Sequence, residues 1–221
     1  MISMNTPIEN RYHIRLEHEP QLFTKWAITE DKKRSDALYI VSKLKDELLY
    51  PDKDIRVPYI DKAMIVPVVI ELIEDGSFTV DYIYDFICKK WSRIENGRDL
   101  GILADYLEQC HWYEKDITNT LIRRLKKQTD NKGYITIYRG YNDYSRENGN
   151  SYTLSLDKAI WFSRRFAKES EVCYVKKYKI HITDVLAFIT NRNEAEIVAN
   201  HNNVILLETI ETKKDSGAKI S

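Results

Sequence analysis

The sequence predicts an α+β protein, with a helical N-terminal region at residues 1–130 and a compact β-rich domain at residues 131–211. Two observations lead to this prediction. Between residues 35 and 129, apolar residues recur at the three- and four-residue spacing of amphipathic helices. After the polar segment 128–133, apolar residues alternate with polar ones in short runs typical of strands. The last residues, 212–221, are small and polar, and we expect them to form a disordered tail.

Composition indicates an ordinary globular protein and excludes several classes. The 221 residues, 43% of them hydrophobic, are enough for a substantial core. Because 34 basic residues balance 34 acidic ones, the chain lacks the overall cationic charge of a general nucleic-acid or membrane-surface binder. The three cysteines lie far apart without a CxxC pair, so neither a disulfide framework nor a cysteine-rich zinc site is indicated. We expect no signal peptide, no membrane partner and a cytoplasmic location.

The helical region contains four apolar stripes, and its boundaries are marked by capping and breaking residues. Ser35 is expected to cap the first helix, which ends before Pro51. A short apolar segment opens at Pro67 and is closed by Gly76, and Gly97 is expected to follow the end of the next helix. The stripes are Leu38, Val41, Leu44 and Leu48; Val80, Ile83, Ile87, Trp91 and Ile94; Leu100, Leu103, Leu107 and Cys110; and Ile117, Leu121, Ile122 and Leu125.

The β-rich domain is expected to contain six strands, one of them the hydroxyl-rich segment 151–155, and one helix. The first strand is predicted at residues 134–138, where aromatic residues or threonine alternate with isoleucine. Ser155 can cap a helix that carries Ala159, Phe162 and Phe166 on one face. Further strand-like runs follow at residues 173–182, 185–190, 194–199 and 204–210.

Two polar segments of this domain carry residue types suited to ligand binding. Arg139 at the end of the first strand can present its planar guanidinium to a phosphate or carboxylate, and Gly140 permits close backbone approach. Residues 151–155, which include Ser151 and Thr153, form a hydroxyl-rich strand that leads into the helix. A surface ion pair for the arginine, and turn or capping roles for the hydroxyls, remain the simpler alternatives.

The third polar segment, residues 192–198, contains an acidic pair. Glu194 and Glu196 stand two residues apart at the start of a predicted strand, so both side chains should point to the same side of the sheet. On an edge strand such a pair is also explained as a solvated face that prevents edge-to-edge association.

In this order and spacing, the three segments resemble the mono-ADP-ribosyltransferases of the Arg-Ser-Glu class. The similarity rests on YRG at 138–140, SYTLSLDKAIWFSRRF at 151–166 and RNEAEIV at 192–198, and it covers about residues 131–210. The first segment lacks the histidine of the diphtheria-toxin-like branch, which favours the arginine branch. The resemblance implies an ADP-ribosyltransferase-like split β-sandwich that binds NAD in a cleft between two sheets.

The resemblance also implies roles for the polar residues around the dinucleotide. Arg139, beside Gly140, would anchor the phosphate or ribose portion of NAD. Ser151 would hold the sheet edges together beside the nicotinamide ribose, with Thr153 supporting it; the third hydroxyl of the family's Ser-Thr-Ser signature is Thr153 or shifts to Ser155.

By the same resemblance, the acidic pair would carry the chemistry. Cleavage of the bond between nicotinamide and ribose passes through an oxocarbenium-like transition state, as in glycoside hydrolysis. Glu196 would hydrogen-bond the ribose 2′-hydroxyl and stabilise the cation, and Glu194 would engage the acceptor nucleophile. Stacking on nicotinamide could come from Trp161, Tyr152 or Phe188. The histidines are scattered without ligand spacing, so no metal is expected.

The expected activity is therefore NAD-dependent transfer of ADP-ribose to a macromolecular acceptor, preferably a protein, with nucleic acid as the less favoured acceptor. Small stand-alone chains of this kind resemble bacterial or phage effectors. Two alternatives remain open at this point: a NAD glycohydrolase, in which water is the acceptor, and a non-catalytic partner-binding or inhibitor protein with a degenerate cleft.

Overall fold

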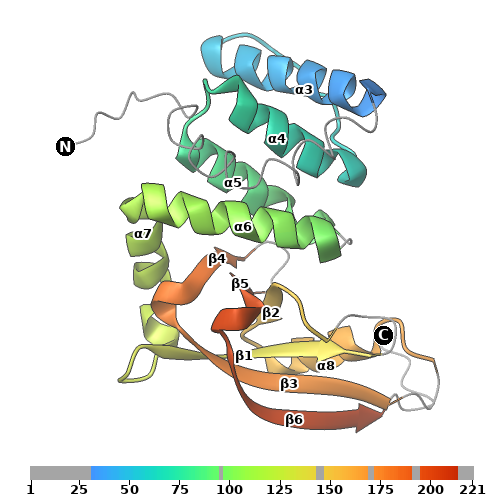
Figure 1. Ribbon diagram of the computed structural model, residues 1–221, viewed down its shortest axis with the longest axis vertical. Helices are drawn as coiled ribbons and strands as arrows, with labels where there is room; N and C mark the ends of the chain where they lie inside the picture. Colours follow the sequence, from blue (N-terminus) through green and yellow to red (C-terminus); the bar gives the residue numbers. More distant parts are fainter. Residues whose placement is uncertain (1–30, 95–96, 143–146, 169–171, 191–194, 214–221) are drawn as a thin grey trace. The chain divides into compact units, whose positions relative to one another are not determined.

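The computed structural model describes residues 31–94, 97–142, 147–168, 172–190 and 195–213 (Figure 1). The chain divides into two compact units, residues 1–95 and residues 96–221, and each is described by itself. Within the described ranges, no helix combines the length and the apolar composition needed to cross a membrane.

The described residues of the first unit form three helices, α3 (Asp31–Leu49), α4 (Ile65–Asp75) and α5 (Val80–Lys90), with the short 3-10 turns η1 (Lys62–Met64) and η2 (Trp91–Arg93). Helix α4 is the centre of this unit, since eight of its eleven residues are buried. Gly76 ends α4 in the left-handed conformation, with φ at 69°, as its position in the sequence predicted. The hydroxyl of Thr79 caps α5 by accepting a hydrogen bond from the backbone N–H of Tyr82 at 3.2 Å.

The prediction for the first helix is wrong at its start and partly wrong in its buried face. Helix α3 already includes Ser35, so this residue does not cap it. Val41 and Leu44 are buried as predicted, but Leu38 and Leu48 are about half exposed. The buried face is instead completed by Ala37 and Ile40.

The stripe predicted for the next helix is confirmed, but its end is not. Val80, Ile83, Ile87, Trp91 and Ile94 are all buried. However, α5 ends at Lys90 and continues as η2, and Gly97 is the first residue of the following helix rather than a residue that closes α5.

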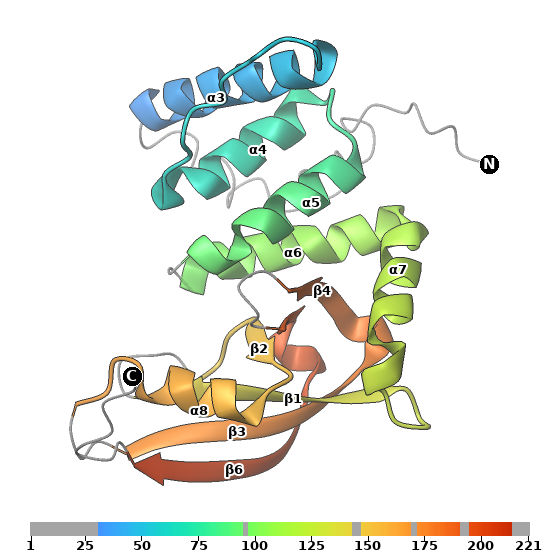
Figure 2. The same ribbon diagram turned by 180° about the vertical axis from the view of Figure 1, so that it is seen from behind.

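The second unit combines three helices with a six-stranded antiparallel sheet, so the predicted α+β class is confirmed (Figures 1 and 2). The strand order is β4-β5-β2-β1-β3-β6. The elements are α6 (Gly97–Tyr113), α7 (Lys115–Leu125), η3 (Lys126–Gln128), β1 (Tyr134–Tyr141), β2 (Ser151–Thr153), α8 (Leu156–Arg164), β3 (Val172–His181), η4 (Ile182–Asp184), β4 (Val185–Ile189), β5 (Glu196–Ala199), η6 (His201–Asn203) and β6 (Ile205–Lys213).

Pairing along the sheet is uneven. Strands β1 and β3 pair over their whole shared length, from Tyr134 opposite His181 to Tyr141 opposite Tyr174. In the part of the chain that is described, β1 and β2 are aligned only at Tyr138 opposite Thr153. The sheet therefore consists of two three-stranded parts, β4-β5-β2 and β1-β3-β6, which meet at that one position.

Helices cover both faces of β1. Because side chains alternate along a strand, Ile135 and Ile137 point to one face, where they share a core cluster with Leu121 and Leu125 of α7. Gly140 lies on the opposite face, where α8 crosses β1 and β3 (Figure 2).

The observed boundary between the two units differs from the boundary predicted at residue 130. The switch from helices to strands occurs near residue 130, as predicted, but the units divide between residues 95 and 96. Helices α6 and α7 belong with the sheet because Leu121 and Leu125 fill its core. In addition, the His111 imidazole on α6 donates from Nε2 to the carbonyl oxygen of Leu186 on β4 at 2.7 Å.

The disordered tail was predicted to begin at residue 212, but β6 continues to Lys213. Thr212 and Lys213 are the last residues of β6 and lie opposite Cys173 and Val172 of β3. The rest of the predicted tail, residues 214–221, lies outside the described residues.

Candidate functional site

The sheet brings the three polar segments onto neighbouring strands. Tyr138 of β1 lies opposite Thr153 of β2, and Thr153 lies opposite Glu196 of β5. Tyr138 and Glu196, which lie far apart in the sequence, are therefore in one row across the sheet. This row crosses the place where the two halves of the sheet are joined.

Arg139 is turned toward the connection between β1 and β2. Its Nε donates to the carbonyl oxygen of Glu147 at 3.0 Å, and its Nη1 donates to the carbonyl oxygen of Ser151 at 2.7 Å. A Cβ on Gly149 would come within 2.5 Å of the Arg139 Nη2 atom, so the chain passes close to the guanidinium at this glycine. Arg139 thus ties the connection and the start of β2 to β1, a role that the sequence did not indicate.

The negative charge of Glu196 affects the pKa of Arg139, although the two side chains lie on opposite faces of the sheet. Alternation places Tyr138, Thr153 and Glu196 on one face of the sheet and Arg139 on the other, with Tyr152. Burial lowers the pKa of the Arg139 guanidinium, and Tyr152, Tyr178 and, as the smallest contribution, the negative charge of Glu196 act in the opposite direction. The two residues are therefore electrostatically coupled across the junction between β1, β2 and β5.

Gly140 serves the packing of α8 rather than the approach of a ligand. A Cβ at this position would overlap the carbonyl oxygen of Ala159 and would lie 2.7 Å from the backbone nitrogen of Ser163. The close approach that the sequence predicted at Gly140 is real, but the group that approaches is the backbone of α8.

The hydroxyl-bearing segment makes local hydrogen bonds. Thr153 is buried, and its Oγ1 accepts from the backbone N–H of Ser155 at 3.2 Å. Ser155 caps α8 as predicted, since its Oγ accepts from the backbone N–H of Lys158 at 3.3 Å. Ser151 is half-buried opposite Val198 of β5, and its carbonyl oxygen is the acceptor for Arg139. The turn and capping roles weighed for this segment are thus present for Thr153 and Ser155.

The strand that carries Glu196, β5, begins at that residue. The residue before it, Ala195, has a positive φ of 44°. The alternation expected to align the two carboxylates therefore does not extend back through Ala195. Glu194 itself lies outside the described residues.

A buried aromatic cluster next to Arg139 was not predicted. The hydroxyl of Tyr152 lies 3.1 Å from Nδ1 of His201, and the Tyr152 ring contacts the Tyr178 ring edge-on, with centroids 5.6 Å apart. Burial raises the pKa of both tyrosines, and burial together with the positive charges of Arg139 and Lys176 lowers the pKa of His201.

The hydroxyl of Tyr178 is a buried polar group of this cluster. Tyr178 is 3% exposed, and its hydroxyl has no hydrogen-bond partner among the residues that the structure describes. Its ring lies 6.3 Å from that of His201. Sequence reasoning missed Tyr178 because it stands in an alternating strand, where a tyrosine is typical of packing.

The three aromatic residues predicted as candidates for stacking on nicotinamide, Tyr152, Phe188 and Trp161, lie in different surroundings. Tyr152 is buried within the core cluster. The Arg124 guanidinium lies over the ring of Phe188, 5.0 Å from its centre. Trp161 is 43% exposed on α8, with the Arg165 guanidinium 5.3 Å from its ring centre.

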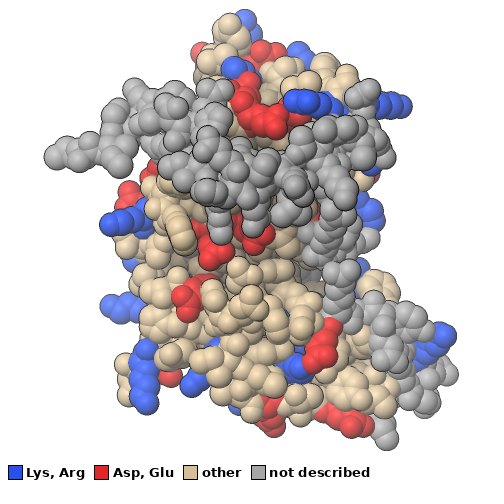
Figure 3. Space-filling view, in the orientation of Figure 1, with Lys and Arg blue, Asp and Glu red and all other residues tan. Residues whose placement is uncertain are grey.

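Potential metal ligands are not grouped together in the described ranges. Within them, no three His, Cys, Asp or Glu side chains are grouped so that they could hold a metal ion. His111 is half-buried, and its imidazole is hydrogen-bonded to Thr118 as well as to Leu186. On the face of the second unit seen in Figure 3, acidic and basic side chains lie scattered among uncharged ones.

Comparisons of the chain with family models, with curated proteins and with solved structures gave no match.

Proposed function

We propose that the second unit is a NAD-dependent mono-ADP-ribosyltransferase of the ADP-ribosyltransferase-like split β-sandwich type, acting on a macromolecular acceptor, preferably a protein. The observation that carries the proposal is the junction of β1, β2 and β5. There the three polar segments lie on adjacent strands, and Glu196 is coupled electrostatically to Arg139. The sheet is joined at that point by one aligned pair, which supports a division into two halves around a ligand.

In the proposed reaction, the bond between the nicotinamide nitrogen and C1′ of the ribose breaks, and its electron pair leaves with neutral nicotinamide. The acceptor nucleophile forms a new bond to C1′ and releases its proton. Glu196 hydrogen-bonds the ribose 2′-hydroxyl and stabilises the positive charge that develops on the sugar. Glu194 engages the acceptor.

Arg139 has a positioning role in this proposal as well as an electrostatic one. Its bonds to the carbonyl oxygens of Glu147 and Ser151 fix the β1–β2 junction, and its positive charge favours the phosphates of NAD.

Labelling of an acceptor tests the proposal. The full chain is incubated with biotinylated NAD in a bacterial lysate, beside the E196Q variant and the matched E211Q variant, whose exposed carboxylate lies on β6. We expect the wild-type protein and E211Q to label the same acceptor and E196Q to label none. Equal labelling by E196Q, with its melting curve unchanged, would remove Glu196 from the mechanism.

The same experiment distinguishes transfer of ADP-ribose to a protein from hydrolysis of NAD, in which water is the acceptor. Nicotinamide release that is the same with and without lysate, without labelled protein, would identify a NAD glycohydrolase. The bonds from Arg139 to the protein's own backbone favour a third outcome, a partner-binding protein without catalysis. That protein would show neither nicotinamide release nor a shift of its melting temperature with NAD.

A further inference from the structure

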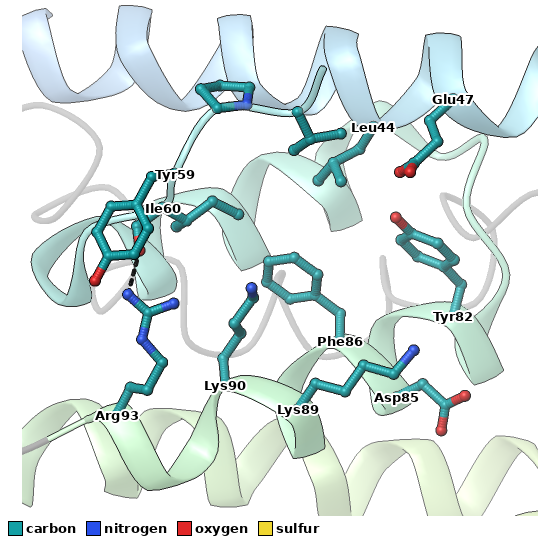
Figure 4. A pocket seen from close by; sticks show the side chains of 12 residues that line it. Leu44, Glu47, Tyr59, Ile60, Tyr82, Asp85, Phe86, Lys89, Lys90 and Arg93 are labelled. Atoms are coloured by element: carbon teal, nitrogen blue, oxygen red, sulfur yellow. Dashed lines mark hydrogen bonds between the residues drawn. The ribbon is translucent and has the colours of Figure 1, made fainter. Parts of the chain in front are cut away.

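The first unit contains a pocket with a cavity volume of about 380 Å³ (Figure 4). Helix α3, the segment 57–60 and the α5–η2 segment form its walls. Leu44, Ile60 and Phe86 provide an apolar lining, and Phe86 lies at the middle of the pocket. The pocket lies wholly within this unit and does not depend on the function proposed for the second one.

Basic side chains line one side of this pocket. They come from the end of α5 and from η2, and they are Lys89, Lys90 and Arg93. The Lys90 ammonium lies 5.6 Å from the centre of the Phe86 ring. In the described part of the chain, neither Lys89 nor Lys90 forms a hydrogen bond or an ion pair with another side chain.

Arg93 is held in a fixed orientation at the edge of the pocket. Its Nη2 donates to the carbonyl oxygen of Ile60 at 2.7 Å, and its guanidinium lies 4.7 Å from the centre of the Tyr59 ring. These contacts use only some of the five N–H groups that a guanidinium carries. A guanidinium that is already oriented loses little side-chain entropy when it binds a phosphate or carboxylate.

Acidic side chains line the opposite end of the pocket. Glu47 and Asp85 lie beside Tyr82, and the Lys89 side chain extends toward that end (Figure 4). Lys90 and Arg93 are thus the cations that remain at the other end, next to Phe86 and Tyr59.

Interaction with the helix dipole explains why cations occur at these positions, but it does not explain why they surround an apolar surface. Positive charges near a helix C-terminus interact favourably with the helix dipole. Burial lowers the pKa of Lys90, and the positive charges of Arg93 and Lys89 lower it further. The basic side chains therefore repel one another around an apolar surface, and a bound anion would relieve this repulsion.

We propose that this pocket binds a small organic anion, whose phosphate or carboxylate group contacts Lys90 and Arg93 and whose flat apolar body lies against Phe86 and Leu44. Lys90 and Arg93 supply the charge, and Phe86 and Leu44 supply the apolar contact, so both parts of the ligand contribute to affinity.

Titration of the ¹⁵N-labelled full chain with phenyl phosphate tests this proposal. We expect shifts of the backbone amides of residues 57–60 and 82–93 and an affinity at least tenfold higher than for inorganic phosphate or for phenol, since each of these lacks one half of the ligand. Benzoate in the same titration shows whether carboxylates bind as phosphates do. No amide shifts with phenyl phosphate or benzoate would overturn the proposal.

Charge-removing variants locate the anion. K90Q and R93Q should each weaken phenyl phosphate binding at least tenfold, while K53Q, which removes an exposed lysine of the same unit, should leave it unchanged. Unaltered affinity in both K90Q and R93Q, with folded spectra, would place the anion elsewhere and contradict the proposal.

Discussion

Gly140 shows how a residue of a binding motif can be required by packing. The backbone of α8 passes so close to β1 that a Cβ at this position would overlap the Ala159 carbonyl and crowd the Ser163 nitrogen. Since both groups belong to helix backbone, neither can move away as a flexible side chain could. The glycine therefore fixes the distance between α8 and the strand that carries Arg139.

We expect the G140A variant to lose at least about 2 kcal/mol of unfolding free energy, the usual range for overpacking of a tight interface. The control is G101A, in α6, where a Cβ meets no atom within 4 Å. This variant should gain about 0.5–1 kcal/mol, because alanine is the better helix former. Urea denaturation of both variants measures the difference, and equal stability of the two would contradict the packing described for α8.

His111 makes the stability of the second unit depend on pH. Burial lowers the pKa of its imidazole below the ordinary value of about 6.5. The unfolded chain therefore takes up this proton at a higher pH than the folded protein does. The stabilisation is complete above about pH 6.5 and is lost as the pH falls toward the folded-state pKa.

Urea midpoints at pH 7.5 and pH 5.5 test this dependence. The wild-type protein should be less stable at pH 5.5. The H111Q variant keeps a side-chain N–H for the Leu186 carbonyl but cannot be protonated, so its loss between the two pH values should be smaller. The pKa of His201 is lowered as well, so some loss should remain. An unchanged loss in H111Q would show that His111 does not titrate in this way.

Single residues could be predicted where a local rule applied. The sequence singled out Arg139, Gly140 and Ser151, and all three lie at the β1–β2 junction. It could not indicate that Arg139 would bond to backbone carbonyls, since one acceptor, Glu147, lies in a connection without a regular pattern and the other, Ser151, lies on a different strand. The contact between Tyr152 and His201, 49 residues apart, likewise depends on strand pairing that composition does not encode.

Some helix ends and some helix faces were predicted correctly, and others were not. Gly76 and Ser155 terminate and begin helices as predicted, because left-handed glycine and hydroxyl capping are local effects. The face of α3 was predicted incorrectly because several apolar residues surround that helix, and tertiary packing selects among them. For Glu194 and Glu196, the positive φ of Ala195 breaks a strand that the sequence pattern made continuous.

Capping of α8 gives a prediction for this helix. S155A removes the acceptor for the Lys158 N–H and should cost about 1 kcal/mol of unfolding free energy. S155D retains an acceptor at the same position and should recover most of that loss. Thermal and urea unfolding measure both variants, and a destabilisation of S155D as large as that of S155A would show that the cap contributes little.

The division of the whole chain follows from the core, not from secondary structure. The sequence placed the boundary at 130, where helices give way to strands. The structure instead assigns α6 and α7 to the sheet, because Leu121 and Leu125 pack with Ile135 and Ile137 in one cluster. An apolar stripe shows that a helix is buried, but it does not show which partner buries it.

Two fragments test this division. The fragment 96–221 keeps the core cluster complete, and we expect a dispersed ¹H–¹⁵N spectrum and cooperative unfolding. The fragment 131–221 lacks Leu121 and Leu125, and we expect it to be unfolded or aggregated, since removing buried leucines costs several kcal/mol in total. A well-folded 131–221 fragment would support the boundary at 130 instead.

Release of nicotinamide from NAD by the purified full chain, measured with bacterial lysate as a source of acceptor, decides whether the junction of β1, β2 and β5 is an active site. The wild-type protein and E211Q should release nicotinamide at the same rate. The rate with E196Q should be at least 100-fold lower, since loss of a group that stabilises a developing charge typically costs a factor of about 10²–10³. No release by the wild-type protein, or equal release by folded E196Q, would contradict the function proposed for this site.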